Sequence, residues 1–211
     1  MEFIVDTIYK LVAITIRIIF FFNGGMEVAG KENIPKEGVI IASNHNSYLD
    51  PPILGSVTPR RCNFMAKKSL FDVPILGWMI KYASFPVDRE KPRASTIKEA
   101  VKKIRNGQIV VVFPEGQRND TKEFLKPKPG IGMIAVMSRC PIVPAYITGA
   151  EKALPPDAKW LKRAKIKVVF GKPIYYTSTE ESRGSTGHDR REEVSMMIMD
   201  AIRDLKEGGS A

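Results

Sequence analysis

A histidine and an aspartate, His45 and Asp50, are the strongest candidates for catalysis in this sequence of 211 residues. They lie in the segment Ser43-Asn-His-Asn-Ser-Tyr-Leu-Asp50, directly after an apolar run typical of a buried strand. On a continuous helix the two side chains would point to different faces, so a turn must separate them if they meet. The carboxylate would then fix the imidazole tautomer, and the histidine would act as a general base on a substrate hydroxyl. The competing interpretation is a capping Asn44 beside a hydrogen-bonded structural histidine.

A second polar cluster, Phe113-Pro-Glu-Gly-Gln-Arg-Asn119, also follows an apolar run. Gly116 would let the backbone approach a ligand closely, and the Arg118 guanidinium has the planar fork that suits phosphate or carboxylate. Arg89 follows a third apolar segment. The ends of buried strands are where α/β proteins expose ligand sites. Taken singly, each arginine could equally be a surface residue.

Short apolar strands alternate with helices along the chain. Strands are expected near 39–42, 62–66, 108–113, 142–148 and 166–170, and helices near 49–57, 96–107, 131–138 and 194–205. Residues 177–190 are polar and rich in Gly and Ser, so a loop is expected there. This alternation predicts an α/β domain over residues 26–207, with a largely parallel sheet flanked by helices and a frayed tail at 208–211.

The first 25 residues are expected to form a separate, strongly apolar helical segment. A helical wheel gathers its charged side chains in one stripe roughly 80° wide: Glu2, Asp6, Lys10 and Arg17. Such a helix could lie in the membrane interface or cross the bilayer, and four charges make crossing costly. We therefore expect a helix that lies on the membrane. A helix packed in the core or a dimer contact is the alternative.

Charge and composition narrow the function classes. The sequence has 33 basic and 23 acidic residues, a net charge of +10, which suits nucleic acid, an anionic membrane surface or phosphorylated substrates. The basic run over residues 159–167 lacks the interleaved aromatics of a nucleic-acid-binding module, and a solvated face or one resting on anionic lipid explains it as well. Net charge alone does not choose among these three kinds of partner.

Few residues are suited to metals or to other catalytic plans. Two histidines, His45 and His188, and two distant cysteines, Cys62 and Cys140, predict neither a metal site nor a disulfide framework, and they favour a reducing compartment. The sequence has no Gly-x-Ser-x-Gly and no His-Glu-x-x-His, which disfavours a serine hydrolase of the common plan and a zinc protease.

Together these segments resemble the glycerolipid acyltransferases that convert lysophosphatidic acid to phosphatidic acid. That family carries Asn-His-x4-Asp, a segment ending in Asp/Asn-Arg, Phe-Pro-Glu-Gly-x-Arg and a Val-Pro segment. The chain has all four in that order, over roughly residues 26–175: Asn44-His45 with Asp50, Asp88-Arg89, Phe113–Gly116 with Arg118, and Val143-Pro144. It departs from the family at Gln117, where Thr or Ser is usual, and at Ser84 and Pro86, which bears on substrate preference more than on the reaction.

The resemblance implies a fold like that of glycerol-3-phosphate acyltransferase and an enzyme of phospholipid synthesis. His45, oriented by Asp50, would deprotonate the free hydroxyl of 1-acylglycerol 3-phosphate, and this hydroxyl would attack an acyl thioester directly, without a covalent acyl-enzyme. The remaining site residues follow from the family pattern: Lys67, Arg89 and Arg118 for the phosphate of the acceptor, Glu115 and Gly116 for its glycerol, and Asn44 and Pro144 in support.

The resemblance also implies the surroundings of the enzyme. No bound cofactor is expected, because the acyl donor, acyl-carrier protein or acyl-coenzyme A, is a co-substrate. The partners would be membrane phospholipid and lysophospholipid, with acyl-carrier protein as one of the two candidate donors, and not nucleic acid. The enzyme would lie on the cytoplasmic face of the cell membrane, anchored by its N-terminal segment.

Three alternatives stay open. The same motifs serve other acceptors, such as glycerol 3-phosphate, another lysolipid or an acylated amine. A hydrolase would use His45 to activate water and would release fatty acid without an acceptor. A non-catalytic module that binds membranes or nucleic acid would not need His45, and the His45/Asp50 pair followed by two arginine motifs argues against it.

Overall fold

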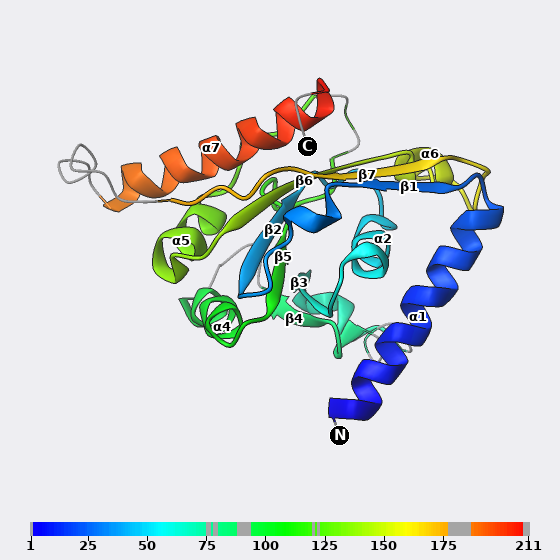
Figure 1. Cartoon of the computed structure of the whole chain (residues 1–211), viewed down its shortest axis with the longest axis horizontal. Coiled ribbons are helices and arrows are strands. Elements are labelled where there is room, and N and C mark those ends of the chain that lie inside the picture. Colours follow the sequence, from blue (N-terminus) through cyan, green and yellow to red (C-terminus); the bar gives the residue numbers. More distant parts are fainter. Residues whose placement is uncertain are drawn as a thin grey trace.

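One twisted sheet organises the computed structural model, which describes residues 2–74, 77, 80–87, 94–119, 121, 123–176 and 187–208. Within these residues seven strands form the sheet, in the order β1-β7-β6-β2-β5-β3-β4 (Figure 1). Their bounds are β1 Met26–Ala29, β2 Val39–Ser43, β3 Cys62–Lys67, β4 Ser84–Val87, β5 Ile109–Val112, β6 Ile142–Thr148 and β7 Ile166–Phe170. All neighbouring strands are parallel except β6 and β7. The predicted α/β class with a largely parallel sheet is therefore confirmed.

Helices cover both faces of the sheet. They are α1 Glu2–Phe22, α2 Asp50–Val57, α4 Ala94–Arg105, α5 Pro129–Ser138, α6 Ala150–Ala153 and α7 Gly187–Lys206, with short 3₁₀ turns at Lys31–Asn33 and Lys68–Leu70. Side chains of α1, α2 and α6 share one apolar core with the sheet, and side chains of α4, α5 and α7 share the other. Figure 1 shows α1 and α2 well apart from α4 and α5.

The central strand β2 is covered by helices on both faces, and its sequence is a continuous apolar run for that reason. Val39 and Ile41 belong to the core under α1 and α2, whereas Ile40 and Ala42 belong to the core under α4, α5 and α7. All four side chains are fully buried. A strand that is covered on both faces needs an apolar residue at every position, not at every second one.

Two strands were not predicted, and both are edges of the sheet. β1 has three exposed residues among its four, and β4 contains Pro86. An edge strand pairs on one side only, so it tolerates polar residues and proline and lacks a continuous apolar run. At the C-terminus, α7 begins at Gly187, inside the segment expected to be a loop, and residues 177–186 of that segment lie outside the described part of the chain.

Helix α1 is held on the domain by part of its own polar stripe. The Asp6 carboxylate lies 3.0 Å from the Arg61 guanidinium, and Arg17 Nε donates a hydrogen bond of 2.5 Å to the backbone oxygen of Ser56 in α2. The Tyr9 hydroxyl donates to another α2 carbonyl, 3.1 Å away, and it is also the acceptor for a backbone N–H of β3. Asp6 and Arg17, two of the four charged residues of the predicted polar stripe, therefore bind the domain.

Most of the apolar side chains of α1 are exposed, although Ile16 and Phe20 pack into the core under the helix. Phe20 alone on the helix is fully buried among the described side chains, at 3 % exposure. The exposed large apolar residues are Phe3, Ile4, Ile8, Leu11, Val12, Ile14, Ile18, Ile19, Phe21 and Phe22. In the part of the chain that the structure describes, no helix has the length and hydropathy needed to cross a membrane.

Candidate active site

The predicted site residues gather where parallel strands end. Strands β2, β3, β4, β5 and β6 run in one direction, so their carboxyl ends share one edge of the sheet. His45 follows the end of β2, Phe113 follows the end of β5, and the exposed Lys67 is the last residue of β3. β4 reaches the same edge at Val87, and Arg89, two positions further on, lies outside the described residues.

His45 and Asp50 form a buried pair. Nδ1 of His45 lies 2.9 Å from Oδ2 of Asp50, and the two residues are 8 % and 1 % exposed. The same oxygen accepts the backbone N–H groups of Asn46 and Ser47, each at 2.7 Å, so a tight turn brings the carboxylate back to the ring before α2 begins. A carboxylate only accepts hydrogen bonds, so Nδ1 carries the proton and Nε2 keeps the lone pair that a general base needs.

Asn44 fixes the start of this turn but does not cap a helix. Its Oδ1 accepts the backbone N–H of Ile147 at 2.8 Å, and its Nδ2 donates to the backbone oxygen of the same residue at 2.9 Å. The side chain thus continues the pairing of β2 with β6 beyond the last paired residue, Ser43. The N-cap of α2 is Leu49, so the capping interpretation of Asn44 is wrong.

Two ring contacts join the loop after β5 to the His45 turn. The Phe113 ring stacks on the imidazole of His45, with centroids 4.1 Å apart and planes 20° apart. The Arg118 guanidinium lies over the Tyr48 ring, 4.2 Å from its centroid. Stacking of this kind restricts both partners, so the two motifs form one surface.

Gly116 is required by the shape of that loop. Its φ is +72°, in the left-handed region that favours glycine. A Cβ added there would also lie 3.0 Å from Cγ of Lys128. Lys128 is therefore the side chain that limits the space at this position.

Glu115 points into the loop, not toward an open surface. It is 1 % exposed, and its Oε2 accepts the Asn119 side chain at 2.6 Å and the backbone N–H of Leu125 at 3.1 Å. Burial raises the pKa of this carboxyl above its ordinary value of 4.5. Glu115 therefore supports the loop in this structure, whereas the sequence analysis expected it to shape the glycerol site.

Asn119 belongs to the second polar cluster of the sequence, but the sequence analysis assigned it no role. Its backbone N–H donates to the backbone oxygen of His45 at 2.7 Å, and its side chain binds Glu115 as described above. Its Oδ1 accepts the backbone N–H and the hydroxyl of Thr121, at 2.9 and 2.7 Å. An asparagine at the end of a turn commonly bonds its own neighbours in this way, and that was the available signal.

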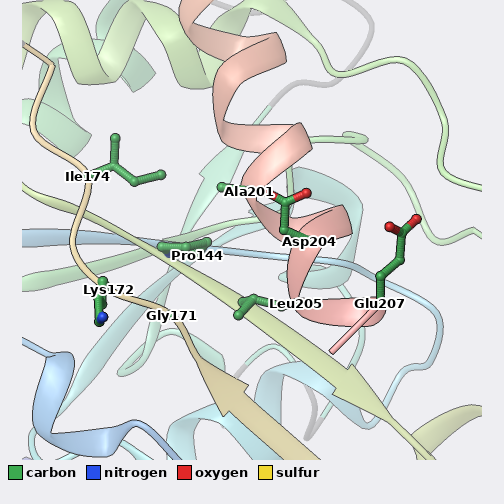
Figure 2. Close-up of a pocket in the computed structure, with 8 residues that line it drawn as sticks. All are labelled: Pro144, Gly171, Lys172, Ile174, Ala201, Asp204, Leu205 and Glu207. Atoms are coloured by element: carbon green, nitrogen blue, oxygen red, sulfur yellow. The ribbon is translucent and has the colours of Figure 1, made fainter. Parts of the chain in front are cut away.

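Pro144 lies away from the His45 edge. It sits within β6, opposite Ala42 of β2, and lines an open pocket of about 440 Å³ between β6, the segment after β7 and α7 (Figure 2). Gly171 donates its backbone N–H to the Pro144 oxygen at 2.8 Å. In this structure Pro144 therefore lies near Leu205 of α7, whereas the sequence analysis expected it to support the site.

A second cavity borders the site. It has a volume of about 450 Å³ and is lined mainly by apolar side chains from β3, β5, α4 and α5, with Phe113 and Gly116 at its border. Since Phe113 stacks on His45, this apolar space begins one ring away from the candidate base.

The fold and site together match known proteins. Residues 25–148 match the Acyltransferase family model, and the chain therefore belongs to the acyltransferase family. It is similar to a 1-acyl-sn-glycerol-3-phosphate acyltransferase of Bacillus subtilis, with 38 % identity over 79 % of this chain and 82 % of the relative. A yeast relative of the same name, from Saccharomyces cerevisiae, is 31 % identical over 85 % of this chain and 60 % of its own longer sequence.

A solved structure agrees with the sequence relatives. The crystal structure of the 1-acyl-sn-glycerophosphate acyltransferase PlsC from Thermotoga maritima superposes with a TM-score of 0.74 at 26 % identity, covering 97 % of this chain and 83 % of that one. The resemblance inferred from the four motifs is thus confirmed.

Proposed function

We propose that this protein transfers a fatty acyl group from an acyl thioester to the free hydroxyl of 1-acylglycerol 3-phosphate, giving phosphatidic acid. The observation that carries the proposal is the buried His45–Asp50 pair, with a hydrogen bond of 2.9 Å, beside a loop that holds Arg118. The names of the Bacillus and yeast relatives point to the same reaction.

The chemistry needs no nucleophile from the protein. Nε2 of His45 takes the proton of the acceptor hydroxyl as its oxygen attacks the thioester carbonyl, and the Asp50 carboxylate stabilises the imidazolium that forms. As the tetrahedral intermediate collapses, the carbon–sulfur bond breaks and the imidazolium returns the proton to the thiolate. The products are phosphatidic acid and the free thiol of acyl-carrier protein or coenzyme A.

Cations at the strand ends would bind the acceptor's phosphate. Arg118 is held against Tyr48 of the His45 turn, and Lys67 is exposed at the end of β3. Guanidinium and ammonium groups match phosphate in charge and hydrogen bonding. We assign the same role to Arg89 from its motif alone. The acyl chain would lie in the apolar cavity bordered by Phe113.

We also propose that α1 lies on the cytoplasmic face of the membrane. Asp6 and Arg17 bind the domain, and many apolar side chains of the helix are exposed, where they would enter the lipid interface. A water-insoluble acceptor and product give such a contact a purpose, because the substrate then reaches the enzyme without leaving the bilayer.

The proposal is tested by acyl transfer in neutral detergent. Native protein receives labelled acyl-coenzyme A or acyl-carrier protein, with lysophosphatidic acid or glycerol 3-phosphate as acceptor. We expect phosphatidic acid from the native chain and a loss of roughly 10²–10⁴-fold in His45→Ala. His188→Ala, which removes the second histidine of the sequence, is the matched control and should keep its activity.

Three results would contradict the proposal. Product from glycerol 3-phosphate alone would assign a different acceptor. Release of fatty acid without any acceptor would indicate a hydrolase. Transfer that survives in His45→Ala would exclude the proposed base.

A further inference from the structure

Between α6 and β7 the chain exposes a short basic segment with a tryptophan in it, Lys159-Trp-Leu-Lys-Arg163, called here the Trp160 segment. All five of its residues are exposed, and Trp160 is 84 % exposed. Tryptophan beside lysine and arginine is typical of the membrane–water interface, where the ring enters the headgroup layer and the cations meet phosphates. The sequence analysis described the basic run over residues 159–167 as lacking interleaved aromatics. That description was wrong, because Trp160 lies within the run and is exposed to solvent.

The Trp160 segment is fixed beside the C-terminal end of α1. The backbone N–H of Ala164 donates to the backbone oxygen of Asn23 at 2.9 Å, and Asn23 directly follows the last residue of α1. The next residue, Gly24, comes so close that an added Cβ would lie 2.5 Å from the Ala164 oxygen. On its other side, Lys162 N–H donates to the oxygen of Ala153 in α6 at 2.8 Å. Figure 1 shows this part of the chain beside the end of α1.

This attachment joins the segment to the apolar surface of α1. Phe21 and Phe22, the last two residues of the helix, are 73 % and 77 % exposed. Trp160 and Leu161 are exposed as well, and they precede by a few residues the hydrogen bond that ties Ala164 to the end of α1.

The charge of the segment suits an anionic partner. Lys159, Lys162 and Arg163 form no ion pair within the described part of the chain, and the one neighbouring acid is Asp157. The next cation, Lys165, is paired with Glu27 at 2.5 Å and is not counted. Within the described residues, three cations without ion-pair partners therefore lie close in the sequence to an exposed indole.

We propose that the Trp160 segment is a second membrane contact, separate from the apolar face of α1, that binds the headgroups of anionic phospholipids. This inference rests on the membrane contact proposed above for α1, and it adds a preference for anionic lipid that an apolar helix face cannot supply. The product of the proposed reaction is itself such a lipid, so the same contact would strengthen as phosphatidic acid accumulates.

The test compares vesicle binding by the full chain and two matched variants. Phosphatidylcholine vesicles, with and without added phosphatidylglycerol, are sedimented with native protein, Lys159→Gln/Lys162→Gln, and Lys98→Gln/Lys102→Gln. The last pair removes two exposed lysines of α4, which covers the opposite face of the sheet. Each lysine near an anionic surface strengthens binding about fivefold, so the first variant should lose roughly 20-fold on anionic vesicles and little on neutral ones, while the α4 variant changes by less.

Tryptophan fluorescence supplies a second, independent measurement. A blue shift and quenching by brominated lipid are expected in the native chain on anionic vesicles and should be reduced in Trp160→Phe, which leaves only the other tryptophan. All variants should keep native acyl transfer in excess neutral detergent, so a failed acyltransferase assay and a failed lipid contact give different results.

Several outcomes would overturn the inference. One is equal loss of vesicle binding in the α4 variant. Another is an affinity of Lys159→Gln/Lys162→Gln for anionic vesicles that equals that of the native protein. Unchanged vesicle binding with a rate lost only with acyl-carrier protein as donor would assign the segment to that acidic protein instead.

Discussion

The side chain of Asn44 forms two hydrogen bonds with the backbone of Ile147, one to its N–H and one to its carbonyl oxygen, at 2.8 and 2.9 Å. Both groups are buried. The pairing of β2 with β6 therefore reaches one residue further than the backbone alone allows, up to the residue before the candidate base.

Asn44→Ala should destabilise the fold as well as the site. It leaves a buried donor and a buried acceptor of Ile147 without partners, at about 1–3 kcal/mol each, so we expect the free energy of unfolding to fall by about 2–6 kcal/mol. Asn44→Asp keeps the acceptor for the Ile147 N–H and loses the donor to its carbonyl oxygen. Its free energy of unfolding should therefore lie between those of the native protein and Asn44→Ala. Urea unfolding followed by circular dichroism measures this, and an Asp variant as unstable as the Ala variant would contradict it.

Asp50 has two separable roles, one toward His45 and one toward the backbone. Asp50→Asn keeps an oxygen for the N–H groups of Asn46 and Ser47 but loses the charge, so kcat should fall roughly 10²–10⁴-fold with little loss of stability. Asp50→Ala also frees those N–H groups and should lower the free energy of unfolding by about 1–3 kcal/mol. Rates and urea unfolding of both variants check this, and equal stability of the two would count against the turn described here.

Tyr48 should act on acceptor binding through Arg118. The guanidinium lies 4.2 Å from the ring centroid, and an exposed cation–π contact is worth about 0.5–1 kcal/mol. Tyr48→Ala should therefore raise KM for lysophosphatidic acid about two- to fivefold with kcat nearly unchanged, and Tyr48→Phe, which keeps a ring, should stay near the native value. An equal rise of KM in the Phe variant would show that the hydroxyl, and not the ring, matters.

Glu115 should make stability depend on pH. Burial raises its pKa above 4.5, so between 4.5 and the raised value the folded chain binds more protons than the unfolded chain, and stability falls as pH rises through that window. Glu115→Gln cannot ionise and keeps an oxygen for Asn119 and Leu125, so it should lack this part of the decline. Urea unfolding of both proteins over a pH series checks this, and parallel curves would contradict it.

The exposed face of α1 should determine binding to neutral vesicles. Leu11→Ser/Ile18→Ser removes two apolar side chains that are 60 % and 52 % exposed, so the folded domain should be unaffected while phosphatidylcholine binding weakens at least tenfold. Flotation of the vesicles measures this. Phe20→Ser, which changes a buried residue, should instead lower the free energy of unfolding.

The strands next to the site could be predicted because burial on both faces gives a simple signal. Runs such as Val39–Ala42 are apolar at every position, and the polar residues that follow them mark strand ends. The edge strands β1 and β4 give no such signal, because one side of each is unpaired. α7 was predicted to start later than it does, since its first turns lack the apolar spacing of its C-terminal half.

The sequence predicted which residues form the site, but it did not predict most of the contacts between them. The meeting of His45 with Asp50 required a turn, and the sequence indicated that turn. The inward direction of Glu115 depends on Asn119 and Leu125, whose positions follow from the folded loop and not from a motif. The direction of the polar stripe on α1 likewise depends on Arg61, which lies far along the chain.

The hydrogen bond of 2.7 Å from Asn119 to the backbone of His45 has a consequence for the evolution of this site. It ties the loop that would recognise the acceptor to the residue that would activate it. A loop taken from another acyltransferase would change the distance between its own backbone and that of His45. It would therefore move His45 as well as the surface that recognises the acceptor. Acceptor specificity should therefore change by paired substitutions in both segments, and single-loop chimaeras should lose turnover before they gain a new substrate.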